Sequence, residues 1–404
     1  MDSTVLAIFA FVYLGMFLGE VPGLALDRAG VALLGAITLL VAERVTPEAA
    51  WNAVDVPTLA LLFGLMVVSA QFRLGRFYSF LTRRMSAAQV SPSALLGMVV
   101  ASAGILSALL ANDIVCLAMA PVLAEGCSRR GLDPVPFLLA LACSANVGSA
   151  ATLIGNPQNM LIGQTLHLSF AAYLLDALVP AGLGLLAVWW VIRSATNGKW
   201  HKATTIPPVP APDFNLWQSI KALTVLLLLV AAFLFTAWPR EVLALAAAGI
   251  LLTSRKMASR LVLGLVDWQL LVLFVGLFVV NHALIASGTL PALRQSAESV
   301  GVNLSHAAPF FVVSVLLSNL VSNVPAVMFL LPSATHPSAG PILALSSTLA
   351  GNLLIVGSIA NIIVVDQAAQ LGLKITWRDH ARIGIPVTLL TLLIAAAWLA
   401  VRAA

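Results

Sequence analysis

The chain has 404 residues, of which 60% are hydrophobic and only 9% are charged, and its mean hydropathy is +1.01. A soluble core of this size cannot hide so much apolar surface from water, so the composition excludes a soluble globular protein. It predicts an all-α integral membrane protein with many crossings. The net charge of +5 is spread over many loops, as sorting of basic residues to the cytoplasmic side would place it, and we expect no nucleic-acid partner.

Apolar runs long enough to cross the hydrocarbon layer predict about ten transmembrane crossings. They lie near residues 4–20, 29–42, 57–72, 135–166, 171–192, 219–236, 242–254, 267–286, 341–368 and 383–401. The first run lacks the basic start and cleavage site of a secretory signal, so we predict that it is retained as a span. Cys116, Cys127 and Cys143 form no CxxC pair and lie in or beside apolar sequence, so we expect neither disulfides nor cysteine-bound metal.

Several apolar runs are interrupted by polar residues. The runs 135–166 and 341–368 are too long for one helix and contain the sequences GNPQN (155–159) and GSIAN (357–361), so each is predicted to be a broken helix. The runs 92–125 and 308–333 are predicted to be re-entrant hairpins, each folding back at an asparagine, Asn112 or Asn323. By length alone, residues 92–110 are also long enough for a full crossing.

Two segments 212 positions apart carry nearly the same sequence: residues 55–68 align without a gap on residues 267–280. Each is followed by a predicted hairpin and a predicted broken helix, which indicates a duplicated unit. The predicted repeats are residues 1–193 and 218–404. A proline-rich linker, 194–217, joins them and is expected to be extended and cytoplasmic.

Basic residues flank the first predicted hairpin on both sides, so both of its ends are predicted to be cytoplasmic. Carrying this assignment along the chain leaves only four of the 21 Lys and Arg residues outside: Arg44, Arg240, Arg294 and Arg402. The two repeats then have opposite orientations in the cytoplasmic membrane. Both termini are predicted to lie outside.

Interrupted helices leave backbone groups without partners inside the bilayer, at a cost of several kcal/mol each unless a cavity, an ion or a side chain satisfies them. Helix N-termini suit an anionic solute, and carbonyl and Asn oxygens suit Na⁺ or a proton path. The candidate substrate-binding residues are Asn112, Asp113, Thr152, Gly155, Asn156, Asn159, Ser322, Asn323, Gly357, Ser358 and Asn361. Candidates for the coupling ion are Asn112, Asp113, Asn146, Asn323 and Asn352. The alternative is that these polar residues only hold helices together.

Asp113 places a carboxylate at a hairpin tip, where its counterpart in the second repeat is the apolar Val324. It is expected either to bind a cation or exchange a proton, or else to cap a helix. Asp55 and Asp267 occupy matching helix starts, and N-capping accounts for them. The chain contains no HExxH, GxSxG or Walker A pattern, so we expect neither an enzyme nor an ATP-driven pump. We expect Na⁺ or H⁺ to be the coupling ion, and we expect no cofactor.

At these residues the chain resembles the ion transporter superfamily, which includes divalent anion:sodium symporters, arsenite/antimonite permeases and certain sodium/proton antiporters. The segment 145–159 is similar to the Gly-Thr-Pro-Pro-Asn-like loop of the symporters, and 357–361 occupies the equivalent place without the double proline. The two hairpin tips stand where the symporters carry Ser-Asn-Thr, but neither tip keeps the threonine. Because those threonine-containing tips contact dicarboxylate in the symporters, dicarboxylate specificity does not carry over.

The resemblance implies a scaffold domain and a moving transport domain in each subunit of a homodimer, with elevator-like alternating access. We therefore expect an ion-gradient-driven transporter of a small anion or oxyanion, with Na⁺ bound at the hairpin tips and broken-helix loops if Na⁺ is the coupling ion. The tips look closer to those of arsenite permeases, so arsenite or antimonite efflux is the first alternative, followed by sodium/proton antiport. An ion channel is the alternative from another class.

Overall fold

The computed structural model describes residues 2–19, 25–202, 206–209, 213–253, 258–299 and 301–403. These residues form helices and connecting loops, with one isolated β-bridge between Leu132 and His201. The predicted all-α membrane fold is confirmed. The α-helices are α1 (Ser3–Leu18), α2 (Arg28–Val41), α3 (Pro47–Ala53), α4 (Val56–Leu74), α5 (Phe77–Ala87), α6 (Pro92–Leu109), α7 (Asn112–Arg129), α8 (Pro134–Ser149), α9 (Pro157–Thr165), α10 (Phe170–Thr196), α11 (Leu216–Phe235), α12 (Arg240–Leu252), α13 (Ser259–Leu263), α14 (Trp268–Ala286), α15 (Thr289–Ser299), α16 (Ala307–Val321), α17 (Asn323–Leu330), α18 (Ala339–Ala350), α19 (Ile359–Gln370) and α20 (Trp377–Ala403), and two 3₁₀ turns cover Leu331–Ser333 and Ile355–Gly357.

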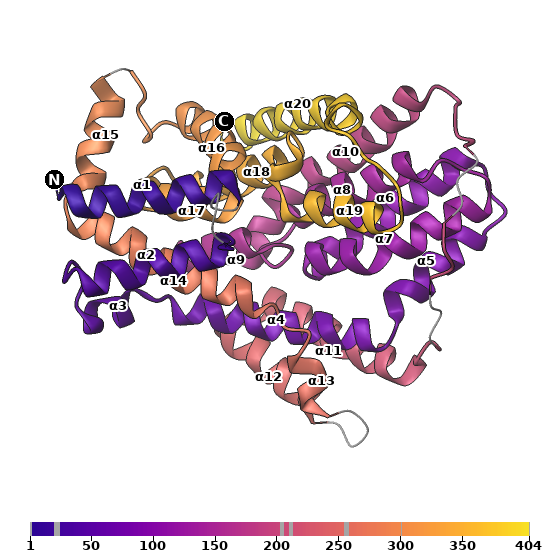
Figure 1. Cartoon of the computed structure of the whole chain (residues 1–404), viewed down its shortest axis with the longest axis horizontal. Helices are drawn as coiled ribbons and strands as arrows, with labels where there is room; N and C mark the ends of the chain where they lie inside the picture. Colours follow the sequence, from indigo (N-terminus) through magenta and orange to yellow (C-terminus); the bar gives the residue numbers. More distant parts are fainter. Residues whose placement is uncertain are drawn as a thin grey trace.

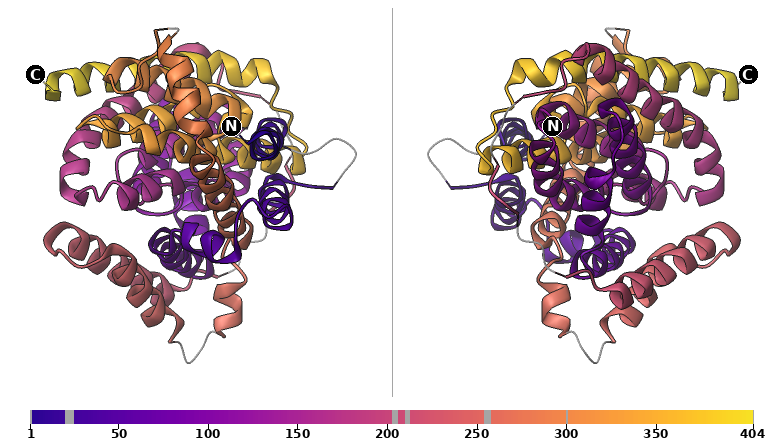
Figure 2. Two further views of the ribbon diagram at one scale, coloured as in Figure 1. Left: turned by 90° about the vertical axis from the view of Figure 1, so that its left-hand side faces the viewer. Right: turned by 90° about the vertical axis from the view of Figure 1, so that its right-hand side faces the viewer.

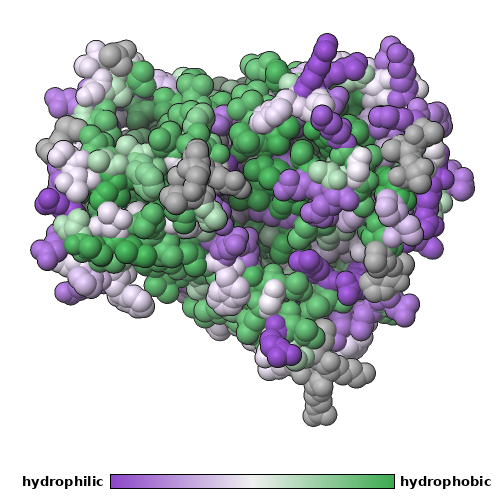
Figure 3. Space-filling view, in the orientation of Figure 1, coloured by the Kyte–Doolittle hydropathy of each residue, from purple (hydrophilic) through white to green (hydrophobic). Residues whose placement is uncertain are grey.

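Many of the longer helices run along the long axis of the molecule, with α20 along one side and α11 to α13 on the other (Figure 1). The two views along that axis show the same arrangement, with α20 at the top and α13 at the bottom (Figure 2). Hydrophobic residues cover much of the visible face, and hydrophilic residues gather toward the two ends of the long axis (Figure 3). This distribution matches a protein that spans a membrane along its long axis.

Six of the described helices are long and apolar enough to cross a membrane: α4, α6, α10, α11, α14 and α20. Five of them match predicted crossings, whereas α6 is the first arm of a predicted hairpin. Other predicted spans, such as α1 and α2, form apolar helices of fewer than 18 residues. The number of crossings therefore stays a prediction.

Four helices, α3, α5, α13 and α15, were not predicted, because none of them forms a long apolar run: α3 and α13 are short, and α5 and α15 are rich in polar residues. The predicted linker 194–217 is shorter than expected, since α10 extends to Thr196 and α11 begins at Leu216. Pro207 and Pro208 of that linker lie outside regular structure. Pro210 and Pro212 lie outside the described residues.

The two flanks of the α6–α7 pair meet at one end of the molecule. Glu125, which is only 3% exposed, lies 2.7 Å from Arg129 and 3.6 Å from Arg83. Arg130 donates to the carbonyl oxygens of Ala88 and Val90. The basic residues before α6 and after α7 therefore share one environment, as the ends of a hairpin do.

Two glycine contacts hold the helices of the duplicated segments together. A Cβ on Gly64 of α4 would lie 2.6 Å from the carbonyl carbon of Ala244 in α12, and a Cβ on Gly276 of α14 would lie 2.6 Å from that of Ala32 in α2. Gly276 stands 212 positions after Gly64, and Ala244 stands 212 positions after Ala32. In both cases a helix of one half packs on a helix of the other half through the same close backbone contact, for which only glycine leaves room.

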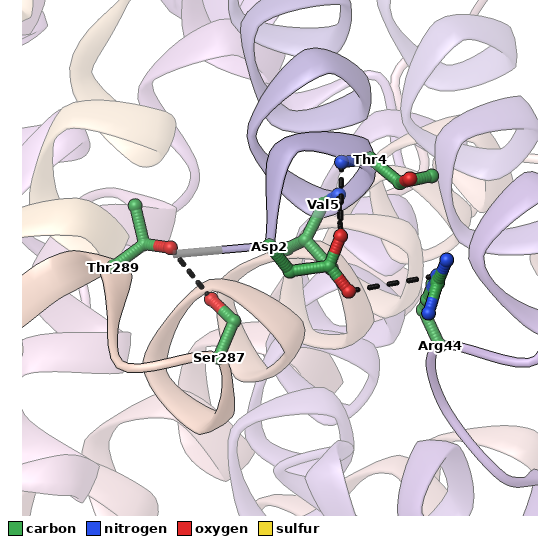
Figure 4. Close-up of polar contacts among 6 residues, drawn as sticks. All are labelled: Asp2, Thr4, Val5, Arg44, Ser287 and Thr289. Carbon is green, nitrogen blue, oxygen red and sulfur yellow. Dashed lines mark hydrogen bonds and ion pairs between the residues drawn. The ribbon is translucent and has the colours of Figure 1, made fainter.

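Polar contacts hold the start of the chain against neighbouring segments. Asp2 accepts hydrogen bonds from the N–H groups of Thr4 and Val5 and lies 3.5 Å from Arg44 (Figure 4). In the same view the hydroxyls of Ser287 and Thr289 lie 2.8 Å apart, where α14 ends. The start of α1 and the end of α2 therefore lie side by side.

Asp55 and Asp267 cap α4 and α14 by accepting hydrogen bonds from the N–H groups of Thr58 and Leu270. The capping role predicted for both residues is confirmed. The Tyr13 hydroxyl of α1 lies within hydrogen-bonding distance of the side-chain oxygen of Asn281 and the carbonyl oxygen of Pro325. This contact ties α1 and α14 to α17.

Candidate substrate and ion site

The first interrupted helix breaks between Ser149 and Pro157, and its break is held together by two asparagines. Pro157 is the first residue of α9, where a missing N–H costs nothing, and the Asn156 side chain caps α9 by accepting from the Asn159 N–H at 2.9 Å. Asn159 Nδ2 donates to the carbonyl oxygens of Ser149 and Thr152, ten and seven residues upstream. One buried amide therefore satisfies two of the carbonyl groups that the break leaves without helical partners.

The second interrupted helix repeats this arrangement. Asn361 Nδ2 donates to the carbonyl oxygens of Gly351 and Leu354, again ten and seven residues upstream. Ser358 caps α19 by accepting from the Ala360 N–H at 3.2 Å. The loops 150–156 and 351–358 thus share one hydrogen-bonding plan, with counterpart residues 202 positions apart.

The two breaks are also linked to each other by matching hydrogen bonds. Asn146 Nδ2 of α8 donates to Asn361 Oδ1 at 3.2 Å, and the Thr348 hydroxyl of α18 donates to Asn159 Oδ1 at 3.3 Å. Ser358 Oγ in turn donates to Asn146 Oδ1 at 2.8 Å. The end of each half's first helical segment therefore reaches the opposite half's break.

The two hairpin tips reach the same polar layer. Asn112, the first residue of α7, donates through Nδ2 to Asn146 Oδ1 at 3.4 Å and through its N–H to the carbonyl oxygen of Gly155. Asn323, the first residue of α17, packs so closely on Gly351 that a Cβ there would lie 3.3 Å from Asn323 Nδ2. The first tip thus contacts the first break, and the second tip contacts the second.

The second tip carries a strained residue. Ser322 has φ +74°, in the left-handed region that a residue with a Cβ rarely adopts. Its conformation turns the chain directly from α16 into α17, and the N–H groups of Asn323 and Val324 then find no partner among the described residues. A helix N-terminus with free donors therefore faces the polar layer, which favours an anionic or oxygen-rich ligand there.

The same tips offer acceptors without partners. Asn112 Oδ1 and Asn323 Oδ1 are both buried and without a hydrogen-bond partner among the described residues, and the two side chains are 5% and 8% exposed. A buried amide oxygen left unpaired costs about 1–3 kcal/mol, so two at equivalent positions point to an external partner. Amide oxygens of this kind suit Na⁺.

Asp113 adds a negative charge beside this layer. The N-cap of α7 is Ala111, with no capping side-chain bond, so the helix-cap alternative for Asp113 is wrong. Among the described residues no ion pair involves Asp113, which is half-buried. Its carboxylate is therefore left for a ligand or a proton.

The structure joins the predicted site residues other than Asp113 and Ser322 into one layer by hydrogen bonds or close contacts, together with residues that were not predicted. Thr152 bonds the carbonyl oxygen of Ala108, and Asn352 accepts from Asn146 at 2.8 Å, so both lie within it. The residues that sequence reasoning missed are Ser149, Gln158, Tyr173 and Thr348, which bond to Asn156, Asn159 or each other. Thr348 could have been identified as a site residue from the sequence, because it aligns with Asn146 once the two breaks are superposed.

Two hairpin tips, each in contact with an interrupted helix inside an apolar bundle, are typical of a membrane transporter. Residues 8–342 match the family model described as CitMHS, citrate transporter, and the chain belongs to this family. The silicon efflux transporter LSI3 of Oryza sativa subsp. japonica is 29% identical over 92% of this chain and 92% of its own. The inner membrane protein YbiR of Escherichia coli (strain K12) is 31% identical over 81% of this chain and 83% of its own.

The crystal structure of the YdaH transporter of Alcanivorax borkumensis has the same fold, with a TM-score of 0.60 over 98% of this chain and 96% of that chain, at 14% identity. The predicted membership in the ion transporter superfamily is confirmed by the family match and by this fold. The family is described as citrate transporters and LSI3 is named a transporter, neither being an enzyme, which agrees with the expectation from the motifs.

Proposed function

We propose that the protein is a secondary transporter that moves a small anion or oxyanion across the cytoplasmic membrane by alternating access, driven by a gradient of Na⁺ or H⁺. The observation that carries the proposal is the pair of buried, unpartnered oxygens, Asn112 Oδ1 and Asn323 Oδ1, at two hairpin tips that contact two interrupted helices. The free N–H groups at the start of α17 supply donors for the substrate, and the two amide oxygens supply ligands for a coupling cation.

Asp113 distinguishes the two kinds of coupling. As a permanent carboxylate it adds charge to a Na⁺ site, whereas as a proton carrier it exchanges H⁺ with the cavity. The second tip has the apolar Val324 at the equivalent position, so only one tip carries this charge. The cation is therefore expected to bind on the side of α7.

Efflux of an undissociated oxyacid, such as arsenite, antimonite or a silicon compound, is the second candidate. None of the site residues carries a positive charge, and a multiply charged organic anion usually needs Arg or Lys to balance it. Amide and hydroxyl groups instead suit a small polyhydroxylated solute. LSI3, a silicon efflux transporter by name, agrees with this candidate.

The test is a substrate panel in proteoliposomes with an imposed Na⁺ or H⁺ gradient, including citrate, phosphate, sulfate, arsenite and silicic acid. Accumulation of one solute above its equilibrium level, lost in the Asn112→Ala variant, is the expected result. Movement that only dissipates a solute gradient would indicate a channel and overturn the proposal. The same panel run in both orientations gives the direction of transport, and reconstitution at known subunit ratios tests the expected homodimer.

A further inference from the structure

An arginine at the start of α12 fastens that helix to α9. Arg240 Nη2 donates to the carbonyl oxygen of Gly163 at 2.6 Å, and beside it Gln164 Nε2 donates to Glu241 Oε2 at 3.0 Å. Helix α9 also packs on α4, the helix that holds α12 through Gly64. At this end of the molecule, the interrupted helix is therefore closed against the α4–α12 pair.

The second half has the same parts in a different arrangement. Arg28 is the first residue of α2, as Arg240 is of α12, and the reciprocal glycine contacts make the two helices counterparts. The counterparts of Gly163 and Gln164 in α19 are Val365 and Asp366, by the 202-residue spacing of the two breaks. Arg28 has no ion pair with any described residue, and its Nε is without a hydrogen-bond partner.

A cavity of about 490 Å³ is lined both by Arg28 and by the first turn of α19. Arg28 lines one wall, together with Asp267 and Gln269 at the start of α14, and Ile359 and Ile362 of α19 line the other. The α2–α14 pair is thus parted from α19, whereas the α12–α4 pair is fastened to α9. The two halves therefore differ at this interface: Arg240 bonds α9, whereas no bond from Arg28 to α19 is described.

We propose that Arg28 and Arg240 are positioning residues that bind the interrupted helices in alternation. Arg240 binds α9 in one state of the transporter, and Arg28 binds α19 in the other. In the arrangement described here Arg240 bonds the carbonyl oxygen of Gly163, while Arg28 lines the cavity and its buried Nε has no hydrogen-bond partner among the described residues. In the opposite arrangement Arg28 bonds the carbonyl oxygen of Val365 and the carboxylate of Asp366, the cavity closes, and Arg240 leaves Gly163. This inference rests on the proposed alternating access, because an inverted pair of repeats reaches its second state by exchanging the contacts of its two halves.

Exposure of one reporter in the cavity tests the direction of each arginine's effect. The reporter is Gln269→Cys in a variant whose Cys116, Cys127 and Cys143 are replaced by Ala, and the readout is its labelling rate with a maleimide. Arg28→Gln is expected to raise the labelling rate and Arg240→Gln to lower it, each by about fivefold, as expected for loss of one charge-assisted hydrogen bond. Arg378→Gln, which changes an exposed arginine elsewhere, is the control and should leave the rate unchanged. Equal or same-direction shifts would overturn the proposal.

Crosslinking tests the alternation itself and needs no known substrate. One cysteine pair replaces Gln164 and Glu241, and the counterpart pair replaces Ala29 and Asp366, in the same cysteine-free background. In a protein with all four cysteines, mass spectrometry after oxidation should find one disulfide or the other in each molecule. Both disulfides in one molecule, or failure of the 29–366 pair to form under any ion gradient, would refute the proposed alternation. A protein that only dissipates gradients in proteoliposomes would instead refute the proposed function.

Discussion

Asn146 and Thr348 are counterparts in the two halves, and each donates a hydrogen bond to the asparagine in the opposite half's break. The two residues differ chemically. Asn146 also accepts a hydrogen bond from Ser358 through its carboxamide oxygen. The Thr348 hydroxyl instead accepts hydrogen bonds from the side-chain amides of Asn156 and Gln158. A few buried side-chain hydrogen bonds therefore hold the two breaks together, and this set of bonds is called the lock below. This lock joins the two candidate binding loops into one layer.

The Thr348→Ala variant tests this lock. It leaves Asn159 Oδ1 without its donor inside the protein, so we expect the free energy of unfolding to fall by about 1–3 kcal/mol and transport to weaken. Thermal unfolding in detergent and uptake in proteoliposomes measure the two effects. Thr38→Ala is the matched control, because that exposed hydroxyl bonds only the carbonyl oxygen of Leu34 in its own helix. An unchanged melting temperature and full uptake would remove Thr348 from the site.

The Asn112→Ala and Asn323→Ala variants test the hairpin tips. Each removes one of the unpartnered oxygens, so we expect transport to be abolished in both while the protein stays folded. Uptake by the purified, monodisperse variants is the measurement. Asn52→Ala, in the exposed face of α3, serves as the control. Normal uptake by both tip variants would exclude these oxygens from the transport cycle.

The Asp113→Asn variant separates binding from coupling. If the carboxylate carries the coupling charge, the variant exchanges substrate across the membrane at near-normal rate but no longer accumulates it against a gradient. Comparing counterflow with gradient-driven uptake measures the two activities. Asp213→Asn, an exposed loop substitution, should retain both. Gradient-driven accumulation at the wild-type level in Asp113→Asn would show that coupling uses other groups.

The Gly148→Ala variant tests the close contact between α8 and α6. A Cβ at this position would overlap the backbone of Gly104, so we expect a loss of about 1–3 kcal/mol in stability, measured as a lower melting temperature. Gly249→Ala in α12 meets no atom within 4 Å. That substitution should raise stability slightly, because alanine is the better helix former by roughly 0.5–1 kcal/mol. Shifts of the same sign for both variants would contradict the packing described here.

Cysteine labelling tests the orientation of the α6–α7 pair. Arg84→Cys and Arg129→Cys should react with a membrane-impermeant maleimide from the same compartment, the cytoplasm, because Arg83 and Arg129 both approach Glu125. The native thiols Cys116, Cys127 and Cys143 are buried and should contribute little background. Labelling of the two positions from opposite sides would mean that α6 crosses the membrane completely.

Much of the fold could be predicted from the sequence, since its signals are local. Apolar length places the helices, and Gly, Asn and Pro inside apolar runs mark where helices stop, because a break in a bilayer needs residues that satisfy or omit backbone groups. The predicted starts of the two broken helices, 135 and 341, lie within two residues of the helices found, Pro134 and Ala339. The candidate residues at both breaks and both tips were likewise identified from the sequence alone.

Only the tertiary structure decided which of these residues meet. The bond from Asn146 to Asn361 joins residues 215 positions apart, and no local pattern specifies such a pairing. The roles of Ser149 and Tyr173 were missed for the same reason, since a single Ser or Tyr in an apolar helix resembles ordinary packing. The contrast between Arg240, which is bonded, and Arg28, which is not, is invisible in two aligned segments, because it depends on how the halves are placed in space rather than on what each half contains.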